Sequence, residues 1–96
     1  MVARANLRTK VEKILQRRLK QGPRNGSSVR VEESDYRDYL HVYVTSPKFQ
    51  RLSPDERGAK IWQWLEEELT RAEQSKVTLL LTLTPREERD LLGAHR

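Results

Sequence analysis

The chain has 96 residues, of which 34% are charged and 35% hydrophobic, and it contains no cysteine. A chain of this length forms a single domain, here residues 1–96, with one two-layer core and no deep enclosed pocket. Without cysteine, disulfides, thiolate nucleophiles and cysteine-bound clusters are excluded. The sequence has no apolar run long enough to span a membrane and no secretory pattern, so we expect a cytoplasmic protein.

Positive charge is concentrated near the N-terminus. The whole chain has a net charge of +5. Residues 1–30 contain nine lysines or arginines and one acidic residue, a net charge of +8, whereas residues 31–96 have a net charge of −3. The position of this charge is therefore more informative about partners than the total.

The first predicted helix covers residues 5–20, where apolar residues recur at spacings of three and four. Asn6 is a candidate N-cap, and Gly22-Pro23 ends the helix. Residues 21–28, QGPRNGSS, are rich in turn formers and predict a flexible loop. The apolar helix face contains Leu7, Val11, Ile14, Leu15 and Leu19.

Two segments with alternating polarity predict an antiparallel hairpin. Val29 and Val31 alternate with charged residues, and residues 39–46 alternate again after a short polar turn. One face of the second strand contains Leu40, Val42 and Val44, and the other contains Tyr39, His41, Tyr43 and Thr45. We expect Thr78 and Thr82 of a later strand to lie on the same face as the tyrosines.

A capping-box pattern predicts the next helix. Ser53 can cap it, Pro54 suits its first position and Glu56 can close the box. Gly58 is a candidate break between a short helix and a longer one. The core stripe of this region contains Ile61, Leu65, Leu69 and Ala72, with Trp62 beside it.

The C-terminal part predicts one strand and one helix. Residues 76–83, KVTLLLTL, are almost wholly apolar, which favours a strand interior to the sheet. Thr84-Pro85 begins a short last helix that ends near Gly93, followed by a tail over residues 93–96. The predicted order is α-β-β-α-α-β-α, an α+β fold with a three-stranded mixed sheet and helices on one face.

This order, together with three stretches, resembles the BolA-like family, whose fold is similar to the type II KH domain. LHVYVTSPKF matches the family's strand ending in Ser46 with Phe49 three residues later, and RGAKIWQWLEEEL matches the helix that follows. The last strand followed by Thr84-Pro85 matches the family's closing strand and turn. The resemblance implies a regulatory, nucleic-acid-binding role or a glutaredoxin-type protein partner.

The sequence departs from this family at positions that matter for function. The histidine that helps bind an iron–sulfur cluster together with a glutaredoxin falls at Lys76, and the histidine of the helix falls at Gly58. Tyr39 and Arg51 likewise replace a family histidine and a family glycine. A lysine ammonium has no free lone pair for a metal at neutral pH. We therefore expect no metal and no cofactor.

The residues themselves favour a binding protein over an enzyme. His41 and His95 are too far apart in sequence to form a local ligand set, and Thr45 and Ser46 lack a base-and-orienter pair. We expect no catalytic residue and no small-molecule substrate. Ser46 and Phe49 have a structural interpretation, in which the serine ends a strand and the phenylalanine fills the core.

Basic residues of the first helix, loop and strand are the first candidate site. Such a row can neutralise phosphates, although the GXXG loop of nucleic-acid-binding KH domains is missing. The alternative is a solvated helix face that Glu66, Glu67 and Glu68 neutralise. The candidate nucleic-acid-binding residues are Lys10, Lys13, Arg17, Lys20, Arg24 and Arg30.

Aromatic residues form the second candidate site, for a protein partner. Tyr39 and Tyr43 share a strand face that can stack bases or dock a protein, Trp64 is a candidate interface anchor, and Arg51 lies in a nearby loop. The alternative is an ordinary mixed sheet face. We expect a non-enzymatic nucleic-acid-binding regulator or, alternatively, a protein-interaction module, such as a glutaredoxin partner without iron–sulfur ligation.

Overall fold

The computed structural model describes residues 3–20, 26–35 and 39–93. Arg24, most of the predicted loop and residues 94–96 lie outside these ranges. The elements are α1 (Ala3–Leu19), β1 (Ser28–Glu33), β2 (Leu40–Thr45), a 3-10 helix η1 (Pro47–Arg51), α2 (Pro54–Glu68), α3 (Arg71–Gln74), β3 (Val77–Leu83) and α4 (Pro85–Gly93). The predicted element order is confirmed, and η1 is an additional element that was not predicted.

The sheet has three strands in the order β1-β2-β3. The pair β1/β2 is antiparallel and the pair β2/β3 is parallel, so the predicted mixed sheet is confirmed. The prediction that residues 76–83 form an interior strand is wrong, because β2 is central and β3 lies at an edge. The apolar composition of β3 therefore does not result from burial between two strands.

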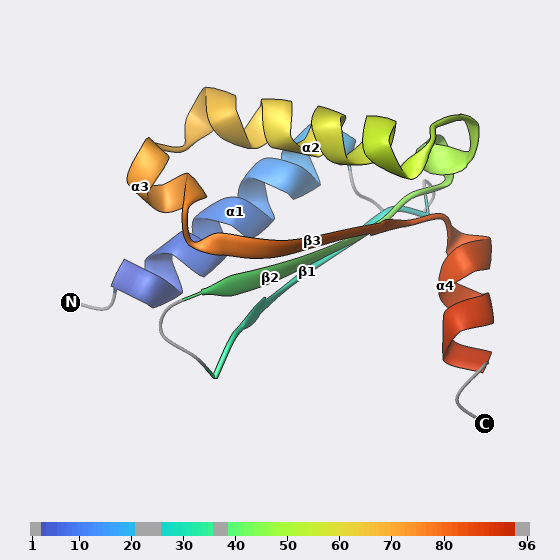
Figure 1. Cartoon of the computed structure of the whole chain (residues 1–96), viewed down its shortest axis with the longest axis horizontal. Coiled ribbons are helices and arrows are strands. Elements are labelled where there is room, and N and C mark those ends of the chain that lie inside the picture. The colour runs from blue at the N-terminus through green and yellow to red at the C-terminus, as the bar shows by residue number, and fades with distance from the viewer. Residues whose placement is uncertain (1–2, 21–25, 36–38, 94–96) are drawn as a thin grey trace.

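The helices α1 and α2 lie side by side over one face of the sheet, with α3 beyond the end of α2 (Figure 1). Val31, Val42 and Val44 point from the sheet into this layer. Ile14, Leu15, Ile61 and Leu65 meet them from α1 and α2, and each is at most 4% exposed. Helix α4 extends from the far end of β3 on the other side of the sheet (Figure 1).

Capping residues set the ends of the two middle helices. Ser53 and Glu56 form the predicted capping box of α2, with both reciprocal hydrogen bonds present. The predicted break at Gly58 is wrong, because α2 runs through that residue. The chain instead leaves the helix at Leu69 and starts α3 with a second capping box of Thr70 and Glu73. Since α3 turns the chain here, Ala72 is exposed rather than part of the core.

At the N-terminus, α1 begins earlier than predicted. Because the helix starts at Ala3, Asn6 is inside it and is not its N-cap. The helix ends as Lys20 takes a left-handed backbone conformation, with φ of 53°. Its N–H donates to Arg17 O at 3.1 Å, which is the usual way a final helical carbonyl is satisfied.

The junction between β2 and α2 is built around three buried side chains. Ser46 Oγ accepts from the Lys48 N–H and lies 2.8 Å from Ser27 Oγ, so it caps η1 as the strand ends. Phe49 is 1% exposed and belongs to the core. Arg57 Nε donates to Phe49 O at 3.1 Å and to Leu52 O at 3.0 Å, which ties α2 to η1. The structural interpretation of Ser46 and Phe49 is thus confirmed.

The register of β3 differs from the expected one. Tyr43 pairs with Leu81, and His41 pairs with Leu79, after a register shift between Leu40 and His41. Thr82 pairs with Val44, whose side chain faces the helices. The expectation that Thr82 shares the tyrosine face is therefore wrong, and that face is more apolar than predicted.

Candidate interaction surfaces

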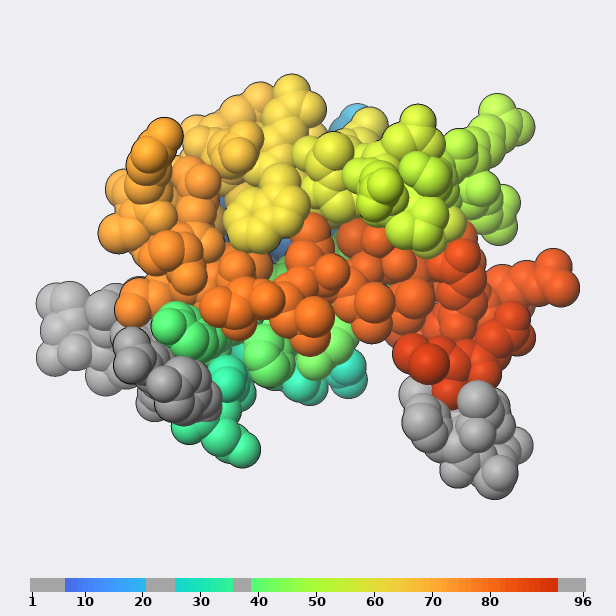
Figure 2. Space-filling model, in the orientation of Figure 1, coloured from blue at the N-terminus to red at the C-terminus, as the bar shows by residue number. Residues whose placement is uncertain are grey.

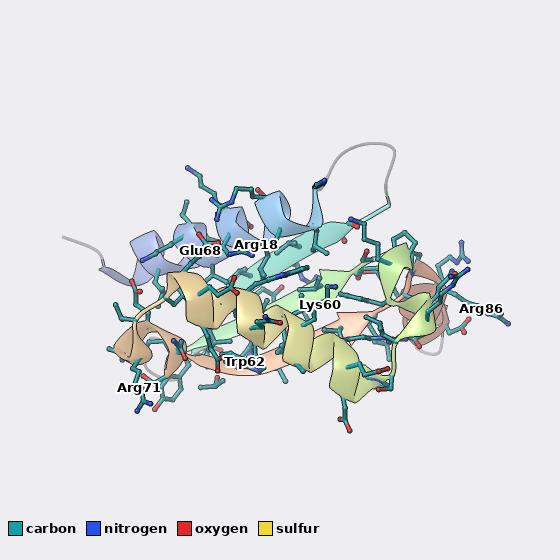
Figure 3. The ribbon with its side chains drawn as sticks, turned by 90° about the horizontal axis from the view of Figure 1, so that it is seen from above. Arg18, Lys60, Trp62, Glu68, Arg71 and Arg86 are labelled. Carbon is teal, nitrogen blue, oxygen red and sulfur yellow. The ribbon has the colours of Figure 1, made fainter. Side chains whose placement is uncertain are left out.

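The basic face of α1 lies beside acidic residues of α2 and α3. Lys10 Nζ is 3.1 Å from Glu73 Oε2, and Arg17 forms an ion pair with Glu68. Arg18 Nε is 3.0 Å from Glu68 Oε2, and its guanidinium also reaches Glu67 at 2.8 Å. Figure 3 shows Arg18 and Glu68 pointing toward each other across the two helices.

These ion pairs shift the pKa values of the acids downward. A hydrogen bond from Arg17 is the main cause that holds the pKa of Glu68 below its ordinary value; desolvation opposes it, and a hydrogen bond from Arg18 lowers the pKa further. The Thr70 backbone N–H and then Lys10 lower the pKa of Glu73 in the same way. Both carboxylates are therefore charged at neutral pH and offset the positive charge of α1.

The predicted nucleic-acid residues do not all lie on one surface. Lys10, Lys13 and Arg17 share the exposed side of α1, and Lys13 has no ion pair among the described residues. Lys20 follows the helix and is exposed. Arg30 lies on the other side of the sheet, because its pairing partner Tyr43 points away from the helices.

The sheet face opposite α1 and α2 is named here the open face, made of Arg30, Glu32, His41, Tyr43, Leu79 and Leu81. The Arg30 guanidinium carbon lies 4.5 Å from the centre of the Tyr43 ring, and its Nε is 3.3 Å from Glu32 Oε2. A cation over a tyrosine ring is an attractive contact. Leu79 is 41% exposed, which makes this face partly apolar.

Helix α4 covers one end of the open face. Thr45 Oγ1 donates to Glu88 Oε2 at 3.0 Å, and Thr45 is only 5% exposed as a result. This hydrogen bond holds α4 against the end of β2. The rest of the open face, around Tyr43 and Leu79, has no helix over it in the described part of the chain (Figure 1).

The predicted partner-binding residues are spread over the molecule. Tyr43 lies on the open face and Tyr39 is half-buried just before β2. Trp64 is half-buried on α2 and packs against the core on the opposite side of the sheet, with Lys60 Nζ 5.7 Å from its ring centre. Arg51 is exposed at the end of η1. These four residues do not form one surface.

Two shallow grooves meet at the buried residue Arg57. One, of about 600 Å³, is lined by residues of η1 and α4, and the other, of about 590 Å³, by β3 and Leu91. Arg57 Nη1 donates to Glu87 Oε1 at 2.7 Å, and this bond lowers the pKa of Glu87. Since the Arg57 guanidinium bonds the carbonyls of Phe49, Leu52 and Thr82 as well as the Glu87 carboxylate, it joins α2 to η1, β3 and α4 structurally.

Among residues 3–20, 26–35 and 39–93, no group of three or more His, Cys, Asp or Glu side chains could hold a metal ion. His41 is half-buried on β2, and His95 is outside the described residues. Across the same ranges, every helix is too short or too polar to span a membrane.

Comparison with known proteins places the fold. No model of a protein family matches the sequence, and no curated protein is significantly similar to it. Among solved structures, the chain is similar to BolA1 from Arabidopsis thaliana, with a TM-score of 0.60 and 18% sequence identity. The match covers 84% of this chain and 94% of that chain. The chain therefore has a BolA-like fold, as the three stretches predicted.

Sequence reasoning missed the contribution of β3 to the candidate surfaces. Leu79 and Leu81 were read as residues of a buried strand, whereas Leu79 is one of the exposed large hydrophobic side chains. The sequence did contain a signal, because an apolar segment without charges fits an edge strand as well as an interior one. Only the strand order distinguishes the two.

Proposed function

We propose that this chain is a non-enzymatic interaction module that binds a partner protein through its open face. One contrast carries the proposal. The cations Lys10, Arg17 and Arg18 of α1 are paired with acids of the neighbouring helices. On the open face Leu79 is 41% exposed, and Arg30, which pairs with its strand neighbour Glu32, lies over the Tyr43 ring. An aromatic ring beside an arginine and an exposed leucine is typical of the centre of a protein interface.

The partner that the BolA-like fold favours is a glutaredoxin-type protein, bound without an iron–sulfur cluster. Lys76 stands where the family resemblance implies the cluster-binding histidine, and Gly58 where it implies the histidine of the helix. A protonated lysine cannot donate an electron pair to iron. The contact would then depend on the apolar and aromatic residues of the open face alone.

Calorimetric titration with a monothiol glutaredoxin of the same organism tests this proposal. We expect binding, no visible absorbance from a cluster, and a loss of about tenfold in affinity for Tyr43→Ala, as for an interface anchor. Trp64→Ala is the matched control, because Trp64 lies on the other side of the sheet. Absence of binding, or equal losses for both variants, would contradict the proposal.

Nucleic-acid binding is the second candidate, and two observations favour it. Residues 1–30 have a net charge of +8. Lys13 is exposed and unpaired within the described residues. Contacts of this kind would be electrostatic, independent of base sequence and weakened by salt.

Fluorescence anisotropy with single- and double-stranded DNA and RNA at increasing salt tests the second candidate. We expect Lys13→Glu to weaken binding more than Lys60→Glu, a control substitution on α2 with the same change in charge. Affinity should fall steeply between low and physiological salt. Binding that is absent, or insensitive to salt, would exclude the basic face of α1 as a nucleic-acid site.

A further inference from the structure

The two edges of the sheet differ in charge. At one edge, β1 carries Arg30, Glu32 and Glu33, and charged side chains of this kind keep an edge strand from pairing with another chain. At the other edge, β3 has the sequence VTLLLTL, with no charged residue and no proline. It therefore lacks the side chains that usually prevent a further strand from pairing.

The outer edge of β3 is accessible in the structure. Figure 2 shows β3 in orange along the front of the molecule, with α2 above it and no helix or strand in front of it. Thr78 is exposed and Leu79 is 41% exposed. An apolar strand at a sheet edge, exposed at Thr78 and Leu79 and half-buried from Leu80 to Leu83, is a site for strand addition.

The sequence of β3 is nearly the same in both directions. About Leu80 as the centre, Leu79 mirrors Leu81 and Thr78 mirrors Thr82. Val77 lies before the register shift and faces the helices with Leu40, whereas Leu83 pairs with Thr45 on the other face, so the match ends at Thr78 and Thr82. When two copies pair antiparallel about a two-fold axis at Leu80, each of these five residues meets the same residue type. Leucine would face leucine and threonine would face threonine, and such matched cross-strand pairs stabilise a sheet.

The backbone of β3 has the orientation that this pairing needs. The Ser46 N–H donates to Leu83 O at 2.9 Å, so the Leu83 carbonyl points toward β2. Arg57 Nη1 lies 3.5 Å from Thr82 O, which points the other way. Because successive residues of a strand direct their backbone groups to alternate sides, Leu80 directs its N–H and C=O outward. Two copies of Leu80 can therefore exchange both hydrogen bonds across the axis.

We propose that β3 is the contact between two copies of this chain, which pair antiparallel about Leu80 into one six-stranded sheet. Because the sequence of β3 matches itself in the reverse direction, a second copy of this chain fits the edge better than an unrelated strand does. In this pairing Leu79 of one copy lies beside Leu81 of the other, and both leucines belong to the open face. The dimer thus joins the two open faces, independently of the partner proposed above.

Sedimentation equilibrium of the full chain tests the proposal by mass. A strand pair of this length buries less than the roughly 800 Å² per partner of a standard interface, so we expect dissociation in the micromolar range, measured between about 5 and 500 µM. The mass should approach twice the 11.3 kDa of the chain at the highest concentration. Salt should strengthen the dimer, because each copy has a net charge of +5.

Charge substitutions test the register. Leu79→Lys places an ammonium at the edge and should leave a monomer, with folding verified by circular dichroism. In the proposed register position 79 of one copy faces position 81 of the other. The double variant Leu79→Lys/Leu81→Glu should therefore regain dimerisation through two opposite-charge pairs, whereas Leu79→Lys/Leu81→Lys should remain a monomer.

Thr9→Lys is the matched control. Thr9 is exposed on α1, which packs against β1 and α2, so this variant adds the same ammonium away from β3. The proposal predicts a dimer for this variant. A wild-type chain that is monomeric at every concentration would overturn the proposal, and so would a monomeric Leu79→Lys/Leu81→Glu variant. Loss of the dimer in Thr9→Lys as well would attribute the effect to added charge and contradict the contact at β3.

Discussion

The two faces of the sheet are made of the same three strands, yet they differ in what covers them. On one face Val31, Val42 and Val44 are at most 3% exposed beneath α1 and α2. On the other, the Arg30 guanidinium lies over the Tyr43 ring, and Leu79 is 41% exposed. The alternation of each strand thus assigns one face to stability and leaves the other available for contacts.

The same comparison extends to the charged residues. On the helix side, acidic residues of α2 and α3 form ion pairs with Lys10, Arg17 and Arg18 of α1. Much of the basic charge of α1 is therefore neutralised within the fold. On the open face, Arg30 lies over an aromatic ring and pairs with its strand neighbour Glu32. A cluster of basic residues in the sequence is therefore weak evidence for a nucleic-acid site when acids of the same chain lie within reach.

The largest expected effect contrasts a buried and an exposed apolar side chain. Ile61 is 0% exposed, and Ile61→Ala should lower the free energy of unfolding by about 2–5 kcal/mol through lost burial and a cavity. Leu79→Ala on the open face should change it by about 0.5 kcal/mol or less, as surface substitutions usually do. Urea unfolding of both variants measures the difference. Similar losses for the two would show that the open face is covered in solution.

The next effect concerns the buried guanidinium of Arg57. Arg57→Met keeps much of the apolar stem but leaves the Phe49 and Leu52 carbonyls without this donor. We expect a loss of about 2–3 kcal/mol in unfolding free energy, the usual cost of unsatisfied buried groups. Arg57→Lys should recover part of the loss, because an ammonium cannot reproduce the forked contacts. Wild-type stability of Arg57→Met would contradict the assigned structural role.

A smaller effect follows from the ion pairs that join the helices. The pKa values of Glu68, Glu73 and Glu87 are lowered in the folded chain. A lowered folded pKa contributes stability above the ordinary pKa, and this contribution is lost as the pH falls below about 4.5 toward the folded values. The urea midpoint should therefore decrease from about pH 5 to pH 3. In Glu87→Gln the decrease should be shallower, and an unchanged pH profile would argue against the Arg57 contact.

Local signals in the sequence predicted most of the fold. The capping box of Ser53 and Glu56 predicted the start of α2. The three stretches that resemble the BolA-like family agree with the structural match to BolA1. The capping box of Thr70 and Glu73 was also readable, although the break was assigned to Gly58 instead. An added Cβ at Gly58 would meet nothing within 4 Å, so this glycine serves no visible turn or close approach. A glycine alone is thus a weaker signal than a cap.

The candidate surfaces depended on long-range contacts that a single sequence does not reveal. The pairing of Arg17 with Glu68 requires α1 and α2 to be neighbours, which the sequence alone leaves open. The position of Leu79 depends on the strand order and on the register shift after Leu40. Both are properties of how distant segments meet, and local periodicity carries no information about them.

Chemical-shift mapping by NMR during titration with the monothiol glutaredoxin tests the central claim most directly. If the open face is the binding surface, the resonances that shift most should belong to Arg30, His41, Tyr43 and Leu79, while those of Lys10, Lys13 and Arg17 remain in place. Shifts confined to the three basic residues of α1, with the open face unchanged, would contradict the account.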